Sequence, residues 1–213
     1  MSITVFLADD HAVIRDGLRY MLEARADIRV IGEADNGRDT VRKVAGCCPD
    51  VVVMDIAMPE LNGIEAASRL DGRCPATKII ILSVYSTSEH IYRALKAGAI
   101  GYVLKESAGR ELIDAILAAH VNRRYLSRKI AEADIDEYIR ERHDQSPLER
   151  LSCREREVLQ LVVEGRSSAE IADIVFLSVK TVETYRSRLM KKLGIKDVPG
   201  LVRFAIQQGL TPL

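Results

Sequence analysis

One pattern repeats five times along the first 120 residues: a short apolar run that suits a β-strand, followed by a segment with helical spacing. The runs are residues 3–8, 28–32, 51–54, 78–82 and 101–104. Because they are continuously apolar rather than alternating, both faces of the sheet must be covered, as in parallel strands joined by right-handed helical crossovers. The pattern predicts an α/β fold with a five-stranded, doubly wound parallel sheet.

Polar side chains stand where these predicted strands end. Asp9 and Asp10 follow the first run, Asp55 the third, Ser83 the fourth and Lys105 the fifth. In open parallel sheets the ligand site lies beyond the carboxyl ends of the strands, near the point where strand order reverses. With the strand order 2-1-3-4-5, the first and third strands are neighbours, so three carboxylates converge.

The converging carboxylates predict a divalent cation. Neighbouring anions repel, and Mg²⁺ relieves this by taking oxygen ligands while keeping room for a phosphate group. Asp55 is then the nucleophile that forms an acyl phosphate, the Lys105 ammonium neutralises the transferred group, and the Ser83 hydroxyl donates to a phosphate oxygen. Singly, each residue fits a turn former, a helix cap or a surface side chain. Their combination favours phosphoryl chemistry.

Four segments carry a resemblance to a known family. They are Leu7-Ala8-Asp9-Asp10-His11, Asp55-Ile56-Ala57-Met58-Pro59 with Gly63, Leu82-Ser83, and Gly101-Tyr102-Val103-Leu104-Lys105. Together they resemble the receiver domain of bacterial two-component response regulators, which has a flavodoxin-like fold. The match spans about residues 1–120.

The resemblance implies roles for these residues. Asp55 accepts a phosphoryl group from a sensor histidine kinase. Asp10, Asp55 and the Ala57 carbonyl ligate Mg²⁺, and Asp9 assists through water. Ser83 and Tyr102 form a switch pair, in which the hydroxyl moves to the phosphate and the ring turns inward. The alternative for Tyr102 is an ordinary core aromatic residue.

Residues 148–213 predict a second, smaller, all-α domain. Ser152-Cys153-Arg154-Glu155 and Ser167-Ser168-Ala169-Glu170 both fit the S-x-x-E capping box that begins helices. A turn then leads to a third helix, with Ser178 as its expected cap, and a fourth covers about residues 198–208. Residues 180–192 carry five basic side chains and one acidic side chain. A short helix, a tight turn and a basic helix together indicate a helix-turn-helix.

A basic helix alone is typical of a solvated face on an ordinary bundle. However, Leu151-Ser152-Cys153-Arg154-Glu155-Arg156-Glu157-Val158-Leu159, Glu170-Ile171-Ala172, and Ser178-Val179-Lys180-Thr181-Val182 with Lys192-Leu193-Gly194 resemble the LuxR-type helix-turn-helix. The resemblance implies that Glu183, Thr184 and Ser187 face base edges, and that phosphates are met by Lys180, Thr181, Tyr185, Arg188, Lys191 and Lys192. Glu183 either accepts from a cytosine amino group or repels non-specific DNA.

The charge distribution divides the chain in the same way. The whole chain is formally neutral, but residues 1–120 hold 14 basic and 17 acidic side chains, and residues 151–213 hold 10 and 7. Residues 121–147 predict a partly helical linker, because Ala131, Ile135 and Ile139 recur at helical spacing and Pro147 then interrupts the chain.

Other features exclude several protein classes. No apolar run approaches the roughly 18 residues of a membrane span, and the first residues lack a signal-peptide pattern, so we expect no membrane association and a cytoplasmic location. Cys47, Cys48, Cys74 and Cys153 lack metal-ligand spacing, and we expect all four to be reduced. The four histidines are scattered and suggest no metal site.

Both halves together resemble the NarL/FixJ class of response regulator. This predicts a transcription factor, not an enzyme, switched by a sensor histidine kinase and acting on double-stranded DNA as a homodimer, with RNA polymerase as a further contact. An aspartyl-phosphate hydrolase is one alternative, but those enzymes need a second acid two residues after the nucleophile, where Ala57 stands here. A DNA-binding protein with a vestigial receiver is the other.

Overall fold

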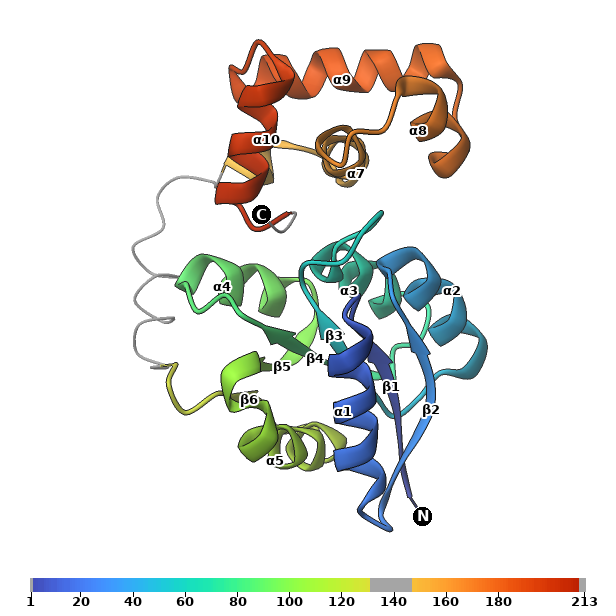
Figure 1. Cartoon of the computed structure of the whole chain (residues 1–213), viewed down its shortest axis with the longest axis vertical. Helices are drawn as coiled ribbons and strands as arrows, with labels where there is room; N and C mark the ends of the chain where they lie inside the picture. Colours follow the sequence, from blue (N-terminus) through green and yellow to red (C-terminus); the bar gives the residue numbers. More distant parts are fainter. Residues whose placement is uncertain (1, 131–146, 211–213) are drawn as a thin grey trace. The chain divides into compact units, whose positions relative to one another are not determined.

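The computed structural model describes residues 2–130 and 147–210 (Figure 1). The described residues form two compact units, one ending at residue 130 and the other beginning at residue 147. Each unit has buried apolar clusters of its own, so each is described by itself.

The first unit is built on one parallel sheet. Its strands are β1 (Ile3–Ala8), β2 (Ile28–Ala34), β3 (Val51–Asp55), β4 (Lys78–Ser83), β5 (Ala99–Leu104) and β6 (Tyr125–Leu126), in the order β2-β1-β3-β4-β5-β6. The predicted doubly wound parallel sheet is confirmed, and so is the adjacency of β1 and β3, in which Ala8 pairs with Met54. The strand order therefore reverses beside β1, where the predicted site lies.

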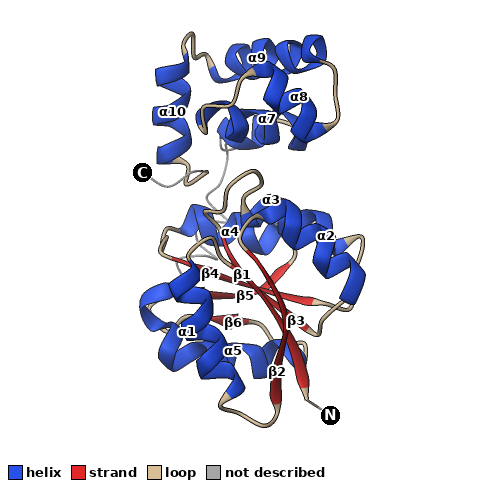
Figure 2. Ribbon diagram, turned by 45° about the vertical axis from the view of Figure 1, so that its right-hand side comes forward, coloured by secondary structure: helices blue, strands red, loops and turns tan. Residues whose placement is uncertain are grey.

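Helices cover both faces of the sheet (Figure 2). On one face, α1 (Ala12–Glu23) and α5 (Ala108–His120) bury Leu18, Leu22 and Leu112 against the strands. On the other, α2 (Gly37–Cys47), α3 (Gly63–Asp71) and α4 (Ser88–Lys96) form a second buried cluster. Continuous burial of β3 between these layers explains why its residues alternate in neither polarity nor size.

The sheet has six strands, which corrects the predicted five. The added strand β6 pairs with β5, and just beyond it the Ser127 amide donates to the Tyr102 carbonyl at 2.9 Å. Buried Glu111 of α5 accepts from the Ser127 hydroxyl and from the Arg128 amide. A strand of two residues has no measurable periodicity, so the sequence pattern could not indicate it.

The predicted linker, residues 121–147, therefore begins as part of the sheet. Residues 125–126 form β6, and Ile130 is buried in the cluster under α4 and β5. The helical spacing of Ala131, Ile135 and Ile139 lies outside the described residues.

A disulfide bond joins Cys48 and Cys74, which corrects the expectation that all four cysteines are reduced. Cys48 follows α2 and Cys74 precedes β4, and their Cα atoms lie 5.7 Å apart, within the usual range for a disulfide. Pairing between positions 26 residues apart depends on the fold, and spacing along the sequence does not indicate it. Cys47 and Cys153 are free and exposed.

The second unit is all-α. A short 3-10 helix (Pro147–Arg150) leads to α7 (Cys153–Val163), α8 (Ser168–Val175), α9 (Val179–Leu193) and α10 (Val198–Gln207). Both predicted capping boxes are present, Ser152 with Glu155 and Ser167 with Glu170, and Ser178 caps α9 as predicted. These caps are local signals, which explains why the sequence indicates these helix starts within a residue or two.

No helix among the described residues is long and apolar enough to cross a bilayer.

Candidate functional site

Three carboxylates meet at the carboxyl end of the sheet. Asp9 and Asp10 follow β1, and Asp55 is the last residue of β3. One ligand atom from each lies within 4.8 Å of the others and of the His11 imidazole. Asp9 and Asp55 are buried, with Asp55 only 3% exposed, whereas Asp10 is partly exposed. Asp10 is therefore the most accessible acid of the three.

Lys105 places its ammonium group between two of these acids. Its Nζ lies 2.7 Å from Asp9 Oδ2 and 2.8 Å from Asp55 Oδ2. Lys105 opens a short 3-10 helix (Lys105–Ser107) directly after β5, so the fold delivers the ammonium to the same edge as the acids. Three carboxylates against one ammonium leave a surplus of negative charge.

Burial and charge act against each other at this cluster. Burial raises the pKa of the Asp55 carboxyl, and the Lys105 ammonium opposes that rise without cancelling it. Burial alone would lower the pKa of Lys105, but Asp55 and Asp9 outweigh it and raise the pKa. Lys105 therefore stays protonated at neutral pH and stabilises whatever negative charge stands at Asp55.

The turn after β3 is held close to Asp55. The Gly63 amide donates to the Ile56 carbonyl at 2.9 Å, and a Cβ atom on Gly63 would lie 2.0 Å from the Asp55 carbonyl oxygen. Any side chain at position 63 would push α3 away from this turn. Ala57, whose carbonyl is the third ligand implied by resemblance, is buried within the same turn.

Ser83 and Tyr102 lie at the ends of neighbouring strands. The Ser83 hydroxyl accepts from the Tyr85 amide at 3.1 Å, and the Tyr102 hydroxyl donates to the Tyr85 carbonyl at 2.7 Å. Both side chains are fully buried, and burial raises the pKa of the Tyr102 hydroxyl. The structure thus has the tyrosine ring turned inward, beside the loop that carries Tyr85.

The oxygen donors suit a hard divalent cation. Apart from their ion pairs with Lys105 and His11, Asp9 Oδ2 and Asp10 Oδ1 accept no hydrogen bond from any described residue. Carboxylate oxygens gathered this closely, with few hydrogen-bond donors around them, fit ligands of Mg²⁺. No arrangement of this kind follows from the separate residues acting as turn formers or helix caps.

The histidines suggested no metal site from their spacing, yet the His11 ring joins this cluster. His11 Nδ1 lies 2.7 Å from Asp10 Oδ1 and 3.1 Å from Asp9 Oδ1. Its position directly after Asp9 and Asp10, at the carboxyl end of β1, was the signal that could have revealed it.

The second candidate surface is the polar face of α9. Its exposed side chains include Lys180, Glu183, Thr184, Ser187, Arg188 and Lys191, while Val182 and Leu189 are buried in the core. Thr181 and Tyr185 are half-buried at the margin. The Thr184 hydroxyl donates to the Lys180 carbonyl at 2.9 Å, so it is left to act as an acceptor.

Lys192 has an additional partner inside the unit. Its Nζ lies 2.6 Å from Oε2 of buried Glu155, the acid of the first capping box. Lys192 therefore ties the end of α9 to the start of α7, a structural role that the sequence did not indicate.

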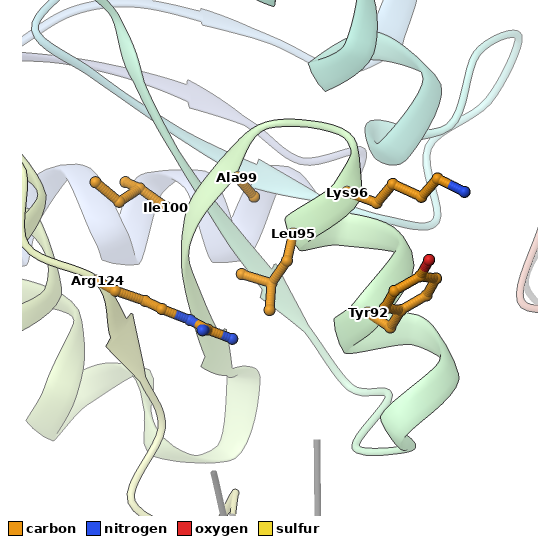
Figure 3. A pocket seen from close by; sticks show the side chains of 6 residues that line it. All are labelled: Tyr92, Leu95, Lys96, Ala99, Ile100 and Arg124. Carbon is orange, nitrogen blue, oxygen red and sulfur yellow. The ribbon is translucent and has the colours of Figure 1, made fainter. Parts of the chain in front are cut away.

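A separate pocket of about 460 Å³ lies on the α4 side of the first unit (Figure 3). It is lined by Tyr92, Leu95 and Lys96 of α4, Ala99 and Ile100 of β5, and Arg124. None of these residues belongs to the acidic cluster.

Comparison with known proteins assigns both units. Residues 5–117 match the family model described as the response regulator receiver domain, and residues 149–205 match that of the bacterial regulatory proteins, luxR family.

Relatives match over nearly the full length. An uncharacterized transcriptional regulatory protein, YxjL of Bacillus subtilis, is 38% identical, over 98% of this chain and 97% of its own. The oxygen regulatory protein NreC of Staphylococcus haemolyticus is 34% identical, over 97% of this chain and 98% of its own. A LuxR-family two-component response regulator from Aurantimonas is similar in structure, with a TM-score of 0.61 and 34% identity, over 65% of this chain and 99% of that one.

Proposed function

The chain belongs to the bacterial response regulators that join a receiver domain to a LuxR-type DNA-binding domain, and from this we propose that a phosphoryl group on Asp55 controls its action on DNA. Members of this family are transcription regulators of two-component systems, not enzymes. Their receiver implies a sensor kinase as partner, and their luxR-type domain binds DNA.

The observation that carries the proposal is Lys105 bridging Asp9 and Asp55 at the switch point of the sheet. In the proposed step the Nε–P or Nδ–P bond of a kinase phosphohistidine breaks, the Asp55 oxygen takes the phosphorus, and the histidine nitrogen keeps its electron pair. Lys105 then neutralises part of the charge on the transferred group, and Ser83 donates its hydroxyl to one phosphate oxygen.

Mg²⁺ is the proposed cofactor. Asp10, Asp55 and the Ala57 carbonyl would hold it, with Asp9 assisting through water. When bound, it supplies charge neutralisation and orientation for the phosphoryl group. The ligand atoms of Asp9, Asp10 and Asp55, which lie within 4.8 Å of one another, support this assignment.

The output follows from the added charge. The phosphoryl group carries about −1.5 to −2 charge in place of the single negative charge of the Asp55 carboxylate, and Tyr102 with Ser83 would report the change to the loop at Tyr85. We propose residues 1–120 as the receiver, 121–147 as a linker that includes β6, and 148–213 as the DNA-binding domain. A homodimer on paired half-sites, a contact with RNA polymerase and a cytoplasmic location complete the proposal.

For DNA we propose that Glu183, Thr184 and Ser187 face base edges and that phosphates are met by Lys180, Thr181, Tyr185, Arg188, Lys191 and Lys192. The exposed polar face of α9 supports this assignment, since most of these side chains reach solvent there. Lys192 is exposed but also forms an ion pair with buried Glu155, so it combines a structural contact with the proposed DNA contact.

The test combines phosphorylation with DNA binding by the full-length chain. Wild type incubated with acetyl phosphate and Mg²⁺ should gain one phosphoryl group by intact mass, and Asp55→Asn should gain none. The matched control is Asp114→Asn, an exposed acid on α5, which should react like wild type. Duplexes selected from a random pool by the phosphorylated protein should bind more tightly with phosphodonor than without it.

Two results would contradict the proposal. Phosphorylation of Asp55→Asn at the wild-type level would place the acceptor elsewhere. Identical affinity and identical oligomeric state with and without phosphodonor would leave the vestigial-receiver alternative as the better description.

A further inference from the structure

Phe176 occupies a backbone position that suits few residues. It ends α8 with φ 57° and ψ 50°, in the left-handed region, and its amide donates to the Ala172 carbonyl. Helix ends of this kind usually carry glycine or asparagine, because a Cβ atom makes the left-handed conformation unfavourable. A bulky phenylalanine there is a genuine outlier, and outliers of this kind gather at functional positions.

The Phe176 side chain is also barely buried by the folded unit. Phe176 is 90% exposed, the highest value among the large apolar side chains that the structure describes. Leu177, the next residue, packs against the core instead. Folding therefore explains neither the backbone conformation of Phe176 nor its exposure.

A second exposed apolar residue lies close by. Val179, the first residue of α9, is 43% exposed, so the two side chains flank Ser178, the cap of α9. The turn that holds them can be followed between α8 and α9 in Figure 1. The N-terminal end of α9 thus has two exposed apolar side chains, Phe176 and Val179, next to its polar face.

The location identifies the partner. In helix-turn-helix proteins the start of the second helix lies in the major groove, where each thymine presents an exposed 5-methyl group. Residues 180–192 add five basic side chains and one acidic side chain, which favours a polyanion over an apolar protein surface. Apolar side chains at such an edge match thymine methyls.

We propose that Phe176, with Val179 beside it, contacts thymine 5-methyl groups in the operator and contributes to sequence preference. The inference deepens the proposed function, because it names a recognition element outside the polar face of α9. Phe176 binds DNA through apolar contact and neutralises no phosphate.

Two substitutions separate this role from a structural one. Phe176→Gly and Phe176→Asn both relax the left-handed backbone, so the melting temperature of the full-length protein should rise. Both also take the aromatic ring away from the DNA, so affinity for the selected duplex should fall, by about fourfold for each thymine methyl group left without an apolar partner. The dependence of affinity on salt should not change, since the interaction with phosphates is untouched.

Removing the thymine methyl groups from the DNA is the change that matches removal of the Phe176 ring from the protein. Replacing thymines of the selected site by deoxyuridine, one at a time, should weaken wild type at one or two positions by about fourfold, and both Phe176 variants should be unaffected at the position that Phe176 contacts. Val198→Ala, which shortens an exposed apolar residue at the start of α10, is the control and should behave like wild type.

The outcomes are distinguishable. Variants that bind within twofold of wild type, keep its deoxyuridine sensitivity or melt at a lower temperature would overturn the inference alone. Unchanged DNA affinity with reduced transcription would also overturn it and assign Phe176 to RNA polymerase. A wild-type protein that selects no duplex would overturn both this inference and the proposed function.

Discussion

At the scale of single residues, the Asp55 carboxylate is held where burial disfavours its charge. Lys105 offsets part of this cost at 2.8 Å, but the same ammonium also serves Asp9. A raised pKa at Asp55 means that the native state binds its proton more tightly than the unfolded chain does. The proposed phosphoacceptor therefore reduces the stability of the native state, as is common at functional sites.

Asp55→Asn should stabilise the receiver. The variant carries no charge at this position, so the free energy of unfolding at neutral pH should rise by about 1 kcal/mol. Because the pKa of Asp55 is raised, wild type loses stability as pH rises from the unfolded value through the folded one. The difference between the two proteins should thus vanish at low pH. Urea unfolding at several pH values, without Mg²⁺, measures it, and a destabilised variant at neutral pH would contradict this account.

Substitution of Lys192 should lower the free energy of unfolding more than substitution of Arg188, although both residues lie on α9. Lys192→Ala removes the partner of buried Glu155 and should lower the free energy of unfolding by about 1 kcal/mol. Burial opposes ionisation of Glu155, but hydrogen bonds from Lys192 and Ser152 win and lower its pKa. The contribution therefore exists above the unfolded pKa and disappears as pH falls through the folded one.

Arg188→Ala is the comparison for Lys192→Ala. Arg188 is exposed, so its loss should leave stability within about 0.5 kcal/mol of wild type. It should instead reduce the slope of log affinity against log salt by about one. Equal losses of stability in the two variants, by urea unfolding, would show that the Lys192–Glu155 ion pair is not the cause.

At the scale of elements, the segment containing β6 is fixed by one buried acid. Glu111 of α5 accepts from the Ser127 hydroxyl and the Arg128 amide, and the Ser127 amide donates to the carbonyl of Tyr102. The proposed switch residue and the start of the linker therefore share a hydrogen bond of the main chain.

Glu111→Ala should loosen this segment. It leaves two donors without their acceptor, which should lower the free energy of unfolding by about 1–3 kcal/mol and reduce the exchange protection of the Ser127 amide. Asp114→Ala, on the same helix but exposed, should change stability by less than about 0.5 kcal/mol. Hydrogen exchange resolved by residue tests this. Full protection of the Ser127 amide in Glu111→Ala would show that Glu111 does not hold this segment.

The disulfide should stabilise the first unit by an amount that depends on the length of the loop that it closes. For 26 residues the chain-entropy estimate is about 3.5 kcal/mol. Cys48→Ser should lower the free energy of unfolding by up to that amount, while Cys47→Ser, a free exposed neighbour, should leave it unchanged. Under a reducing agent, wild type and Cys48→Ser should have the same free energy of unfolding. Equal stability of both variants would mean that the bond does not persist in solution.

Local and non-local signals explain what the sequence could predict. The capping boxes at Ser152 and Ser167 lie within four residues, and the apolar runs of β1 to β5 are long enough to be read directly. The strand β6, the Cys48–Cys74 bond and the Lys192–Glu155 pair each join positions between 20 and 40 residues apart. Such pairings are set by the packed fold, and no pattern along the chain encodes them.

At the scale of the whole molecule, the receiver and the LuxR-type DNA-binding domain are two separate compact units. Each unit has its own buried core, and the charges of the corresponding sequence regions are opposite in sign. The proposed phosphoacceptor Asp55 therefore lies in a unit whose buried clusters include no residue of α9.

The sixth strand also bears on where the chain can be divided. In the parallel sheet, β6 covers the outer edge of β5, whose main-chain groups would otherwise be open to another chain. A fragment ending at residue 120 would lack that cover, whereas one ending at residue 130 would keep it. The shorter fragment should self-associate with rising concentration in sedimentation experiments, and the longer one should remain dispersed under the same conditions.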